Sequence, residues 1–122
     1  MHRKYLIYVH EKDRYELYYF SGIVRSNANY YVIDFEDHGE LLHFLKHSSD
    51  QLYPAHLIID LYDLKHVHML LEDLRYLWPV PPFPVAILWE NKMEPFTHES
   101  VQWYIRPQNH DAWEKLARTI IQ

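Results

Sequence analysis

Apolar and polar positions along the chain follow two alternating periods. Short apolar runs predict strands at residues 5–9, 30–35, 56–61, 84–89 and 101–105. Between most of these runs, apolar residues return every three or four positions, which is the period of an amphipathic helix. Four such stripes occur, and they are Leu17, Phe20 and Val24; Leu41, Leu42 and Leu45; Val67, Leu70, Leu71, Leu74 and Trp78; and Trp113, Leu116, Ala117, Ile120 and Ile121.

Polar residues and prolines mark where the predicted helices begin and end. Asp13 is placed to cap the first helix, and residues 27–29 break it. Residues 36–39 form a turn before the second helix, which ends near residues 48–50. The prolines within residues 79–82 stop the third helix. Strand and helix therefore alternate almost throughout the chain.

This alternation predicts an α/β domain in which helices cover both faces of a parallel sheet. One unit departs from the pattern, because residues 90–100 include Pro95 and leave room for at most a turn or two of helix. The chain contains no linker, repeat or low-complexity segment, so we expect residues 1–122 to form a single domain. Nothing follows the last helical stripe, and we therefore expect no output domain.

Composition and charge exclude several classes of function. The net charge is −5 without a basic block, which argues against binding to nucleic acid. The chain has no cysteine, so disulfides and zinc–thiolate sites are absent, and its two glycines do not form a phosphate-binding loop. No apolar run approaches the ~20 residues of a membrane span, and no signal-peptide core follows the first residues. We therefore expect a cytoplasmic protein that does not bind membranes.

The most informative single residue is Asp60, which ends a short apolar strand near the middle of the chain. In open α/β sheets, functional groups gather at the carboxyl ends of the central strands. Asp60 is therefore either a reactive carboxylate or the remnant of one. Considered alone, it could also simply cap a helix or pair with Arg106.

Three short motifs, in this order and spacing, resemble one protein family. They are Asp60 after Leu57-Ile58-Ile59, Pro84-Val85 at the start of a strand, and Arg106-Pro107 at the end of the last strand. Together with an acidic turn after the first strand, they resemble the receiver domain of response regulators in two-component signalling. The resemblance implies a flavodoxin-like three-layer sandwich with a five-stranded parallel sheet of order 2-1-3-4-5. The family's fourth helix would be shortened or missing between Trp89 and Val101.

The resemblance also implies a phosphorylation site. In that family, an acidic pair after the first strand binds Mg²⁺, and the aspartate that ends the third strand accepts phosphate from a histidine kinase. Asp60 matches the phosphoacceptor, whereas the acidic pair corresponds to His10 and Glu11, so that one carboxylate is missing. Glu11 and Asp60 could still supply two oxygen ligands, but Mg²⁺ disfavours an imidazole nitrogen. We expect Mg²⁺ to bind weakly or not at all.

The remaining positions of the family's site are also altered. A serine or threonine that would contact the phosphoryl group is replaced by Trp89, and losing one such donor typically costs ~2.7–4 kcal/mol in the transition state. The family's lysine corresponds to Arg106, which can pair directly with Asp60 and close the pocket. The aromatic switch position matches Trp103. These changes indicate a receiver-like module whose phosphoacceptor chemistry is weakened or lost.

Two alternatives remain open. The chain could be a competent receiver, phosphorylated on Asp60 by a histidine kinase with Mg²⁺ held at Glu11. It could also be a small α/β enzyme that uses Asp60, His10 and Glu11 as acid and base, although no cofactor motif or nucleophile accompanies them. We favour the non-enzymatic interpretation, in which any chemistry is limited to phosphate transfer onto Asp60.

Aromatic residues indicate the kind of partner. The chain has 11 tyrosines and 4 tryptophans, and exposed aromatic patches usually mark association surfaces. Trp103, Trp113 and Phe96 lie in or near the last strand and helix, on the face that receiver domains use for docking. We therefore expect protein partners and a homodimer formed through this region.

Overall fold

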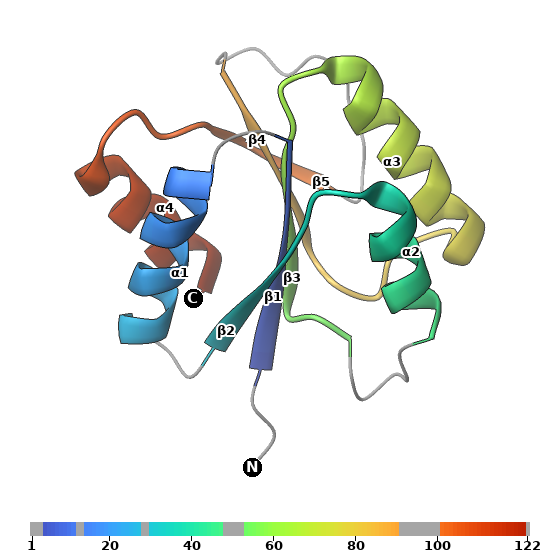
Figure 1. Ribbon diagram of the computed structural model, residues 1–122, viewed down its shortest axis with the longest axis horizontal. Helices are drawn as coiled ribbons and strands as arrows, with labels where there is room; N and C mark the ends of the chain where they lie inside the picture. Colours follow the sequence, from blue (N-terminus) through green and yellow to red (C-terminus); the bar gives the residue numbers. More distant parts are fainter. Residues whose placement is uncertain (1–3, 12–13, 28–29, 48–52, 91–100, 122) are drawn as a thin grey trace.

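The computed structural model describes residues 4–11, 14–27, 30–47, 53–90 and 101–121, and it contains the predicted strands and helices (Figure 1). The elements follow one another in the order expected from the sequence. Their bounds are β1 Lys4–His10, α1 Arg14–Asn27, β2 Tyr30–Phe35, α2 His38–Lys46, β3 His56–Asp60, α3 Leu64–Leu77, β4 Val85–Trp89, β5 Val101–Ile105 and α4 His110–Ile121.

The five strands form one parallel sheet in the order β2-β1-β3-β4-β5, as predicted. Helices α1 and α4 cover one face of the sheet, and α2 and α3 cover the other (Figure 1). This is a flavodoxin-like three-layer arrangement. Because all strands are parallel, their carboxyl ends lie at one edge, where His10 of β1 is paired in register with Asp60 of β3.

The alternation of side chains along β1 divides the core into two halves. Tyr5, Ile7 and Val9 pack with α2 and α3, whereas Leu6 and Tyr8 pack with α1 and α4. Both halves consist almost entirely of apolar side chains that are fully or nearly fully buried. The buried polar exceptions among the described residues gather at the carboxyl edge of the sheet, and they are His10, Asp60 and Arg106.

Two of the helices begin at an aspartate that caps the backbone. The Asp37 carboxylate accepts hydrogen bonds from the backbone N–H groups of Gly39 and Glu40, at 2.7 and 3.2 Å. Asp63 caps α3 by accepting from the N–H of Lys65 at 2.9 Å. These bonds satisfy donors that the first helical turn leaves without a partner. The predicted cap of α1, Asp13, lies outside the described residues.

Some predictions at the ends of elements shift by one residue or fall outside the description. β3 ends at Asp60 rather than at residue 61, and β4 begins at Val85 rather than at residue 84. The segment of the expected shortened helix, and Phe96 with it, lies within residues 91–100, which the structure does not describe.

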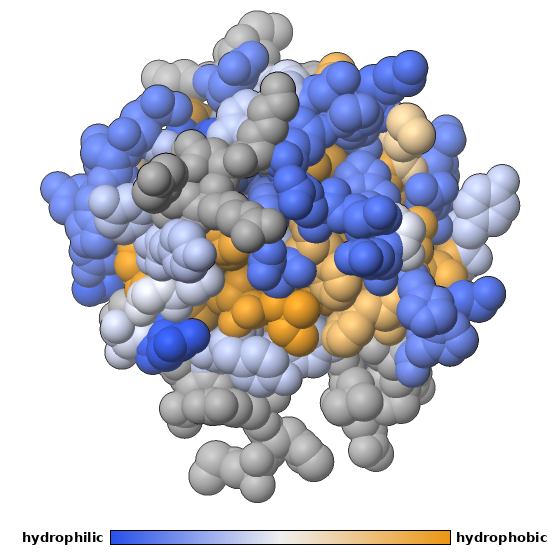
Figure 2. Space-filling model, viewed as in Figure 1, coloured by the Kyte–Doolittle hydropathy of each residue, from blue (hydrophilic) through white to orange (hydrophobic). Residues whose placement is uncertain are grey.

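The surface differs between the helix layers and the sheet edge. Polar side chains dominate over the helices, and an apolar strip lies between the two layers, where β2 runs (Figure 2). Within the described part of the chain, none of the helices is long and apolar enough to cross a membrane.

Candidate functional site

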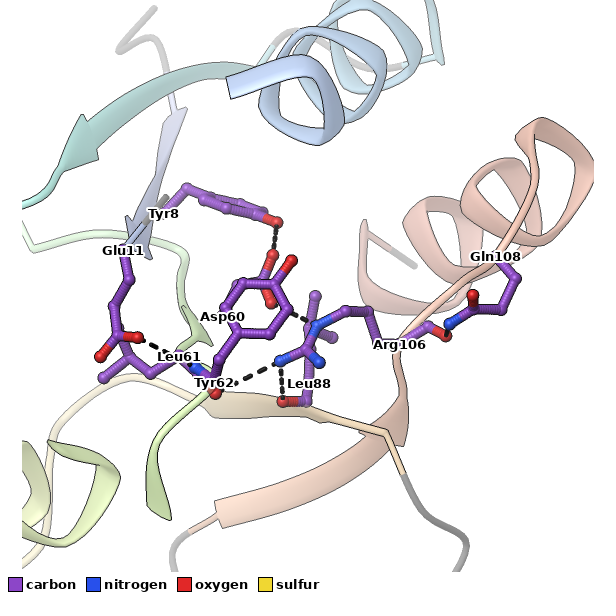
Figure 3. A network of polar contacts seen from close by, with 8 residues as sticks. All are labelled: Tyr8, Glu11, Asp60, Leu61, Tyr62, Leu88, Arg106 and Gln108. Carbon is purple, nitrogen blue, oxygen red and sulfur yellow. Dashed lines mark hydrogen bonds and ion pairs between the residues drawn. The ribbon is translucent and has the colours of Figure 1, made fainter. Parts of the chain in front are cut away.

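Asp60 lies at the carboxyl end of the central strand β3, and its side chain is only 2% exposed. Both of its carboxylate oxygens are hydrogen-bonded to other side chains. Oδ1 accepts from Nε of Arg106 at 2.7 Å, and Oδ2 accepts from the hydroxyl of Tyr8 (Figure 3). The carboxylate is therefore enclosed by a cation on one side and a phenol on the other.

Arg106 reaches this position because β5 ends directly before it. Its backbone N–H donates to the carbonyl of Trp89 at 2.7 Å, which continues the pairing of β4 and β5 by one residue. Its Nη2 donates to the carbonyls of Leu61 and Leu88, at 3.2 and 3.4 Å. One guanidinium thus links the carboxyl ends of β3 and β4 to the end of β5.

Tyr62 covers the buried ion pair from the solvent side. The centre of its ring lies 4.0 Å from the guanidinium carbon of Arg106, within the range of a cation–π contact (Figure 3). The Tyr62 side chain is 42% exposed, whereas Arg106 is 5% exposed. The ring therefore separates the ion pair from water.

The energetics of such a pair depend on how completely its polar atoms are satisfied. Removing two charges from water costs several kcal/mol for each ion, and their attraction offsets this only when further hydrogen bonds complete the geometry. Tyr8, Leu61 and Leu88 supply those bonds here. The pair is consequently costly to break, because removing one partner would leave a buried charge without compensation.

The predicted Mg²⁺ ligands point toward different partners. Oε2 of Glu11 accepts from the backbone N–H of Tyr62 at 3.3 Å, and Oε1 is paired with Nδ1 of His66. Nε2 of His10, which is 2% exposed, lies 2.9 Å from Oδ2 of Asp34. Glu11, His10 and Asp60 are thus each hydrogen-bonded to a different side chain.

These residues do not fit a magnesium site. Mg²⁺ needs several oxygen ligands in near-octahedral order, and the Arg106 guanidinium already neutralises Asp60. No group of three or more histidine or acidic side chains in the described residues is arranged to hold a metal ion. The residues that the sequence marked as possible metal ligands therefore form hydrogen bonds and ion pairs within the protein.

Trp89 does not occupy the space beside Asp60, although its sequence position corresponds to the hydroxyl that would contact phosphate. Its indole packs edge-on against Trp103, with ring centres 6.2 Å apart and an interplanar angle of 78°. Trp103 is half-buried and packs with the core on the side of α2 and α3. The side chains that enclose Asp60 are Tyr8, Arg106 and Tyr62 instead.

Trp113 is a core residue rather than an interface residue, which corrects the expectation from the sequence. Its side chain is 3% exposed and packs against Phe20, with ring centres 6.1 Å apart. The apolar stripe of α4 directs it into the layer between α4 and α1. Of the three aromatic residues expected at an interface, Trp103 is half-buried and Phe96 lies outside the described residues.

Sequence reasoning missed Tyr8, Asp34, Tyr62 and His66 as members of this network. A signal for Tyr8 was present, because it lies two positions before His10 on the same strand and therefore on the same face of the sheet. Asp34 could have been found in a similar way, since it lies next to the end of the neighbouring strand β2, in register with Tyr8. No local pattern connects Tyr62 with Arg106, which is distant from it in sequence.

Two side chains elsewhere have shifted pKa values. Burial lowers the pKa of His56, which begins β3 at the end opposite Asp60. Partial burial raises the pKa of Tyr104 on β5. In both cases the cause is the loss of water around the charged form.

Comparisons with known proteins support the fold alone. No protein-family model matches this sequence, and no match is found among curated proteins. A solved structure, the lysine decarboxylase LdcF of Francisella novicida, is similar with a TM-score of 0.60 and 12% sequence identity. The match covers 99% of this chain and 17% of the decarboxylase chain. The similarity therefore indicates a shared α/β fold over a small part of a much longer chain.

Proposed function

We propose that this protein is a receiver-like domain that acts through contacts with other proteins and has lost phosphoacceptor chemistry. The observation that carries the proposal is the enclosure of Asp60, whose two oxygens are bonded to Tyr8 and Arg106. The strand order and the positions of Asp60 and Arg106 support the relationship to receiver domains. Such a domain would work in the cytoplasm, where histidine kinases meet their receivers.

The chemistry of phosphate transfer explains why this enclosure matters. Transfer requires an attacking oxygen in line with the leaving group and cations that stabilise the phosphoryl oxygens. In this protein the attacking oxygen of Asp60 would first have to lose a charged hydrogen bond within a buried site. The Arg106 guanidinium is already committed to Asp60 and two carbonyls, so it is not free to bind an incoming phosphoryl group.

The surface favours proteins as partners. Tyr18 and Tyr19 of α1 are 70% and 53% exposed, and they line a groove between α1 and α4 together with His110 and Glu114. Aromatic residues of this kind are enriched in protein interfaces. The net charge of −5 disfavours nucleic acid at the same surface.

Incubation with a small phosphodonor and Mg²⁺, followed by intact mass spectrometry, tests the proposal. We expect no mass gain, while a competent receiver treated in parallel gains one phosphoryl group. A gain that is absent in Asp60→Asn would contradict the proposal. It would favour the alternative of a competent receiver that a histidine kinase phosphorylates on Asp60.

A further inference from the structure

Strand β2 forms one edge of the sheet, and its composition is unusual for an edge. In the described part of the chain, β1 is the strand that pairs with it. Five of its residues are half-buried and apolar or aromatic, and one is charged and exposed; in order they are Tyr30, Tyr31, Val32, Ile33, Asp34 and Phe35. An edge strand presents unpaired backbone N–H and C=O groups that can pair with another strand.

β2 itself contains neither lysine nor proline, and its register with β1 runs without a bulge. Protective features include lysine residues, proline, bulges and covering segments. The one charged residue of β2, Asp34, is engaged by His10 at 2.9 Å. The edge faces the viewer between the two helix layers in Figure 1, and the same view of the surface shows an apolar strip there (Figure 2). An extended strand would cover both the apolar strip and the backbone groups.

We propose that the occupant of this edge is β2 of a second copy of the chain, paired antiparallel about a two-fold axis at Val32. Two five-stranded sheets would then join into one continuous sheet. A two-fold axis perpendicular to the sheet leaves each helix layer on its own side. Residues that lie opposite one another in the two copies must therefore point to the same face of the sheet. This holds only if one residue of β2 lies opposite the same residue of the second copy, so the axis passes at a residue and not between two residues.

Charge complementarity selects Val32 as the centre. With the axis at Val32, Asp34 of one copy lies opposite Tyr30 of the other copy. The ammonium of Lys4 lies 5.9 Å from the centre of the Tyr30 ring within each protomer. Each Asp34 would thus approach a lysine of the second copy, and the symmetry repeats this contact. An axis at Ile33 would instead place Asp34 opposite an apolar Val32, which gives the carboxylate no charged partner in the second copy.

This inference is independent of the proposed function, because neither Asp60 nor the two side chains bonded to it, Tyr8 and Arg106, take part in the pairing. It also differs from a dimer formed through β5. The argument for β2 uses residues of β1 and β2 alone, all of which the structure describes.

Disulfide trapping tests the pairing in the full chain, which has no native cysteine. Opposed residues of an antiparallel pair have Cα atoms about 4.5–5.5 Å apart, within the range that a disulfide spans. We expect Val32→Cys to form a covalent dimer under mild oxidation. Ile33→Cys tests the register. In the proposed pairing, residue 33 of one copy lies diagonally across from residue 33 of the other, at about 7–8 Å, so we expect it to cross-link more slowly than Val32→Cys. Tyr76→Cys, at a side chain 91% exposed on α3, controls for random collision.

A charge swap at two exposed positions provides a second test, in which Asp34→Lys also removes the partner of His10. We expect Lys4→Glu to weaken the dimer about tenfold in sedimentation equilibrium, because two repulsive contacts replace two attractive ones. Asp34→Lys should weaken it similarly, and the double variant should recover most of the affinity. Circular dichroism of each variant confirms that it is folded.

Two results would overturn the inference. One is a wild-type chain that sediments as a monomer up to high micromolar concentration. The other is cross-linking of Val32→Cys no faster than that of Tyr76→Cys. In a dimer that is also insensitive to the charge swap, this second result would mean that the contact lies on another surface.

Discussion

At the scale of single residues, Asp60 and Arg106 depend on one another. The two side chains are 2% and 6% exposed, so neither charge is stabilised by water. Each depends on the other and on the hydrogen bonds from Tyr8 and to the carbonyls of Leu61 and Leu88. A carboxylate that the sequence marked as a possible phosphoacceptor is part of a buried structural network.

This dependence predicts a large effect of Asp60→Asn on stability. Replacing the carboxylate leaves the Arg106 guanidinium without its counter-charge, which should lower the free energy of unfolding by about 3–5 kcal/mol. Urea denaturation measures the loss, and Glu72→Gln on the exposed face of α3 serves as the matched control, with an expected change within about 0.5 kcal/mol.

Combining Asp60→Asn with Arg106→Met should restore much of that stability, because the second change removes the uncompensated charge. If Asp60 instead stood among like-charged carboxylates, as an open metal site requires, Asp60→Asn alone would stabilise the protein. A stabilised single variant would therefore contradict the buried ion pair.

His56 predicts a pH dependence of stability. Burial lowers its pKa in the folded protein below the ordinary value of 6.5. As the pH falls through about 6.5, the unfolded chain therefore takes up a proton before the folded protein does, and acidification favours unfolding. This destabilisation grows until the pH reaches the lowered pKa of the folded state, and it is absent above neutral pH.

Urea denaturation between pH 8 and pH 5 measures this effect. Over the acidic part of this range, we expect the free energy of unfolding to fall less for His56→Gln than for the wild type. The difference should be no larger than the uptake of one proton can cause. His68→Gln, at an exposed position of α3, controls for the removal of one histidine. Identical slopes for the wild type and His56→Gln would show that His56 is not the group responsible.

At the scale of elements, caps decide where the helices on the α2–α3 face begin. Asp37 satisfies two backbone donors of α2, and this helix carries Leu41 and Leu45 into the core. Its nine residues are too few for a helix to be stable by itself in water, so it depends on its cap and on packing. The cap therefore stabilises α2, one of the two helices that form this layer.

Asp37→Ala should lower the free energy of unfolding by about 0.5–2 kcal/mol, because the donors of Gly39 and Glu40 lose their acceptor. Thermal or urea denaturation measures the change. Asp37→Ser retains a capping oxygen and should recover most of the loss. Equal destabilisation by alanine and serine would mean that the charge of Asp37, rather than its capping oxygen, stabilises α2.

At the scale of the whole molecule, protection from exchange with solvent should follow the strand order. The central strands β1, β3 and β4 are almost completely buried, whereas every described residue of β2 and β5 is half-buried or exposed. Amide hydrogen exchange should therefore be slowest in the central strands. If two copies pair through β2, protection of β2 should rise with protein concentration while that of β5 does not.

The fold could be predicted from the sequence because it rests on local periodicity. The stripe of Val67, Leu70, Leu71 and Leu74 has one helical face wherever the chain is placed, and all four residues are buried in the structure. Alternation of strands and helices then restricts the sheet to a small set of topologies. The positions of Asp60 and Arg106 at the sheet edge follow from the same rules.

The partners of these residues could not be predicted, because they depend on distances between remote parts of the chain. Asp60 and Arg106 are 46 positions apart, and the sequence left open whether they meet. In the sequence, Tyr8 and Tyr62 look like ordinary aromatic residues of a strand and a loop. In the structure, Tyr8 donates to the Asp60 carboxylate and Tyr62 covers the Arg106 guanidinium. Trp113 shows the converse, since an aromatic that suggested an interface is packed in the core.

The sequence by itself determined the layers and the end of the sheet at which polar groups gather. Those properties arise from side-chain periods of two and 3.6, which act over a few residues. Only the tertiary structure decided what the polar groups do, because a buried carboxylate must take its partners from whatever the folded chain brings within hydrogen-bond distance. Around Asp60 the fold brings an arginine and a tyrosine, and these partners favour a sealed ion pair over a reactive site.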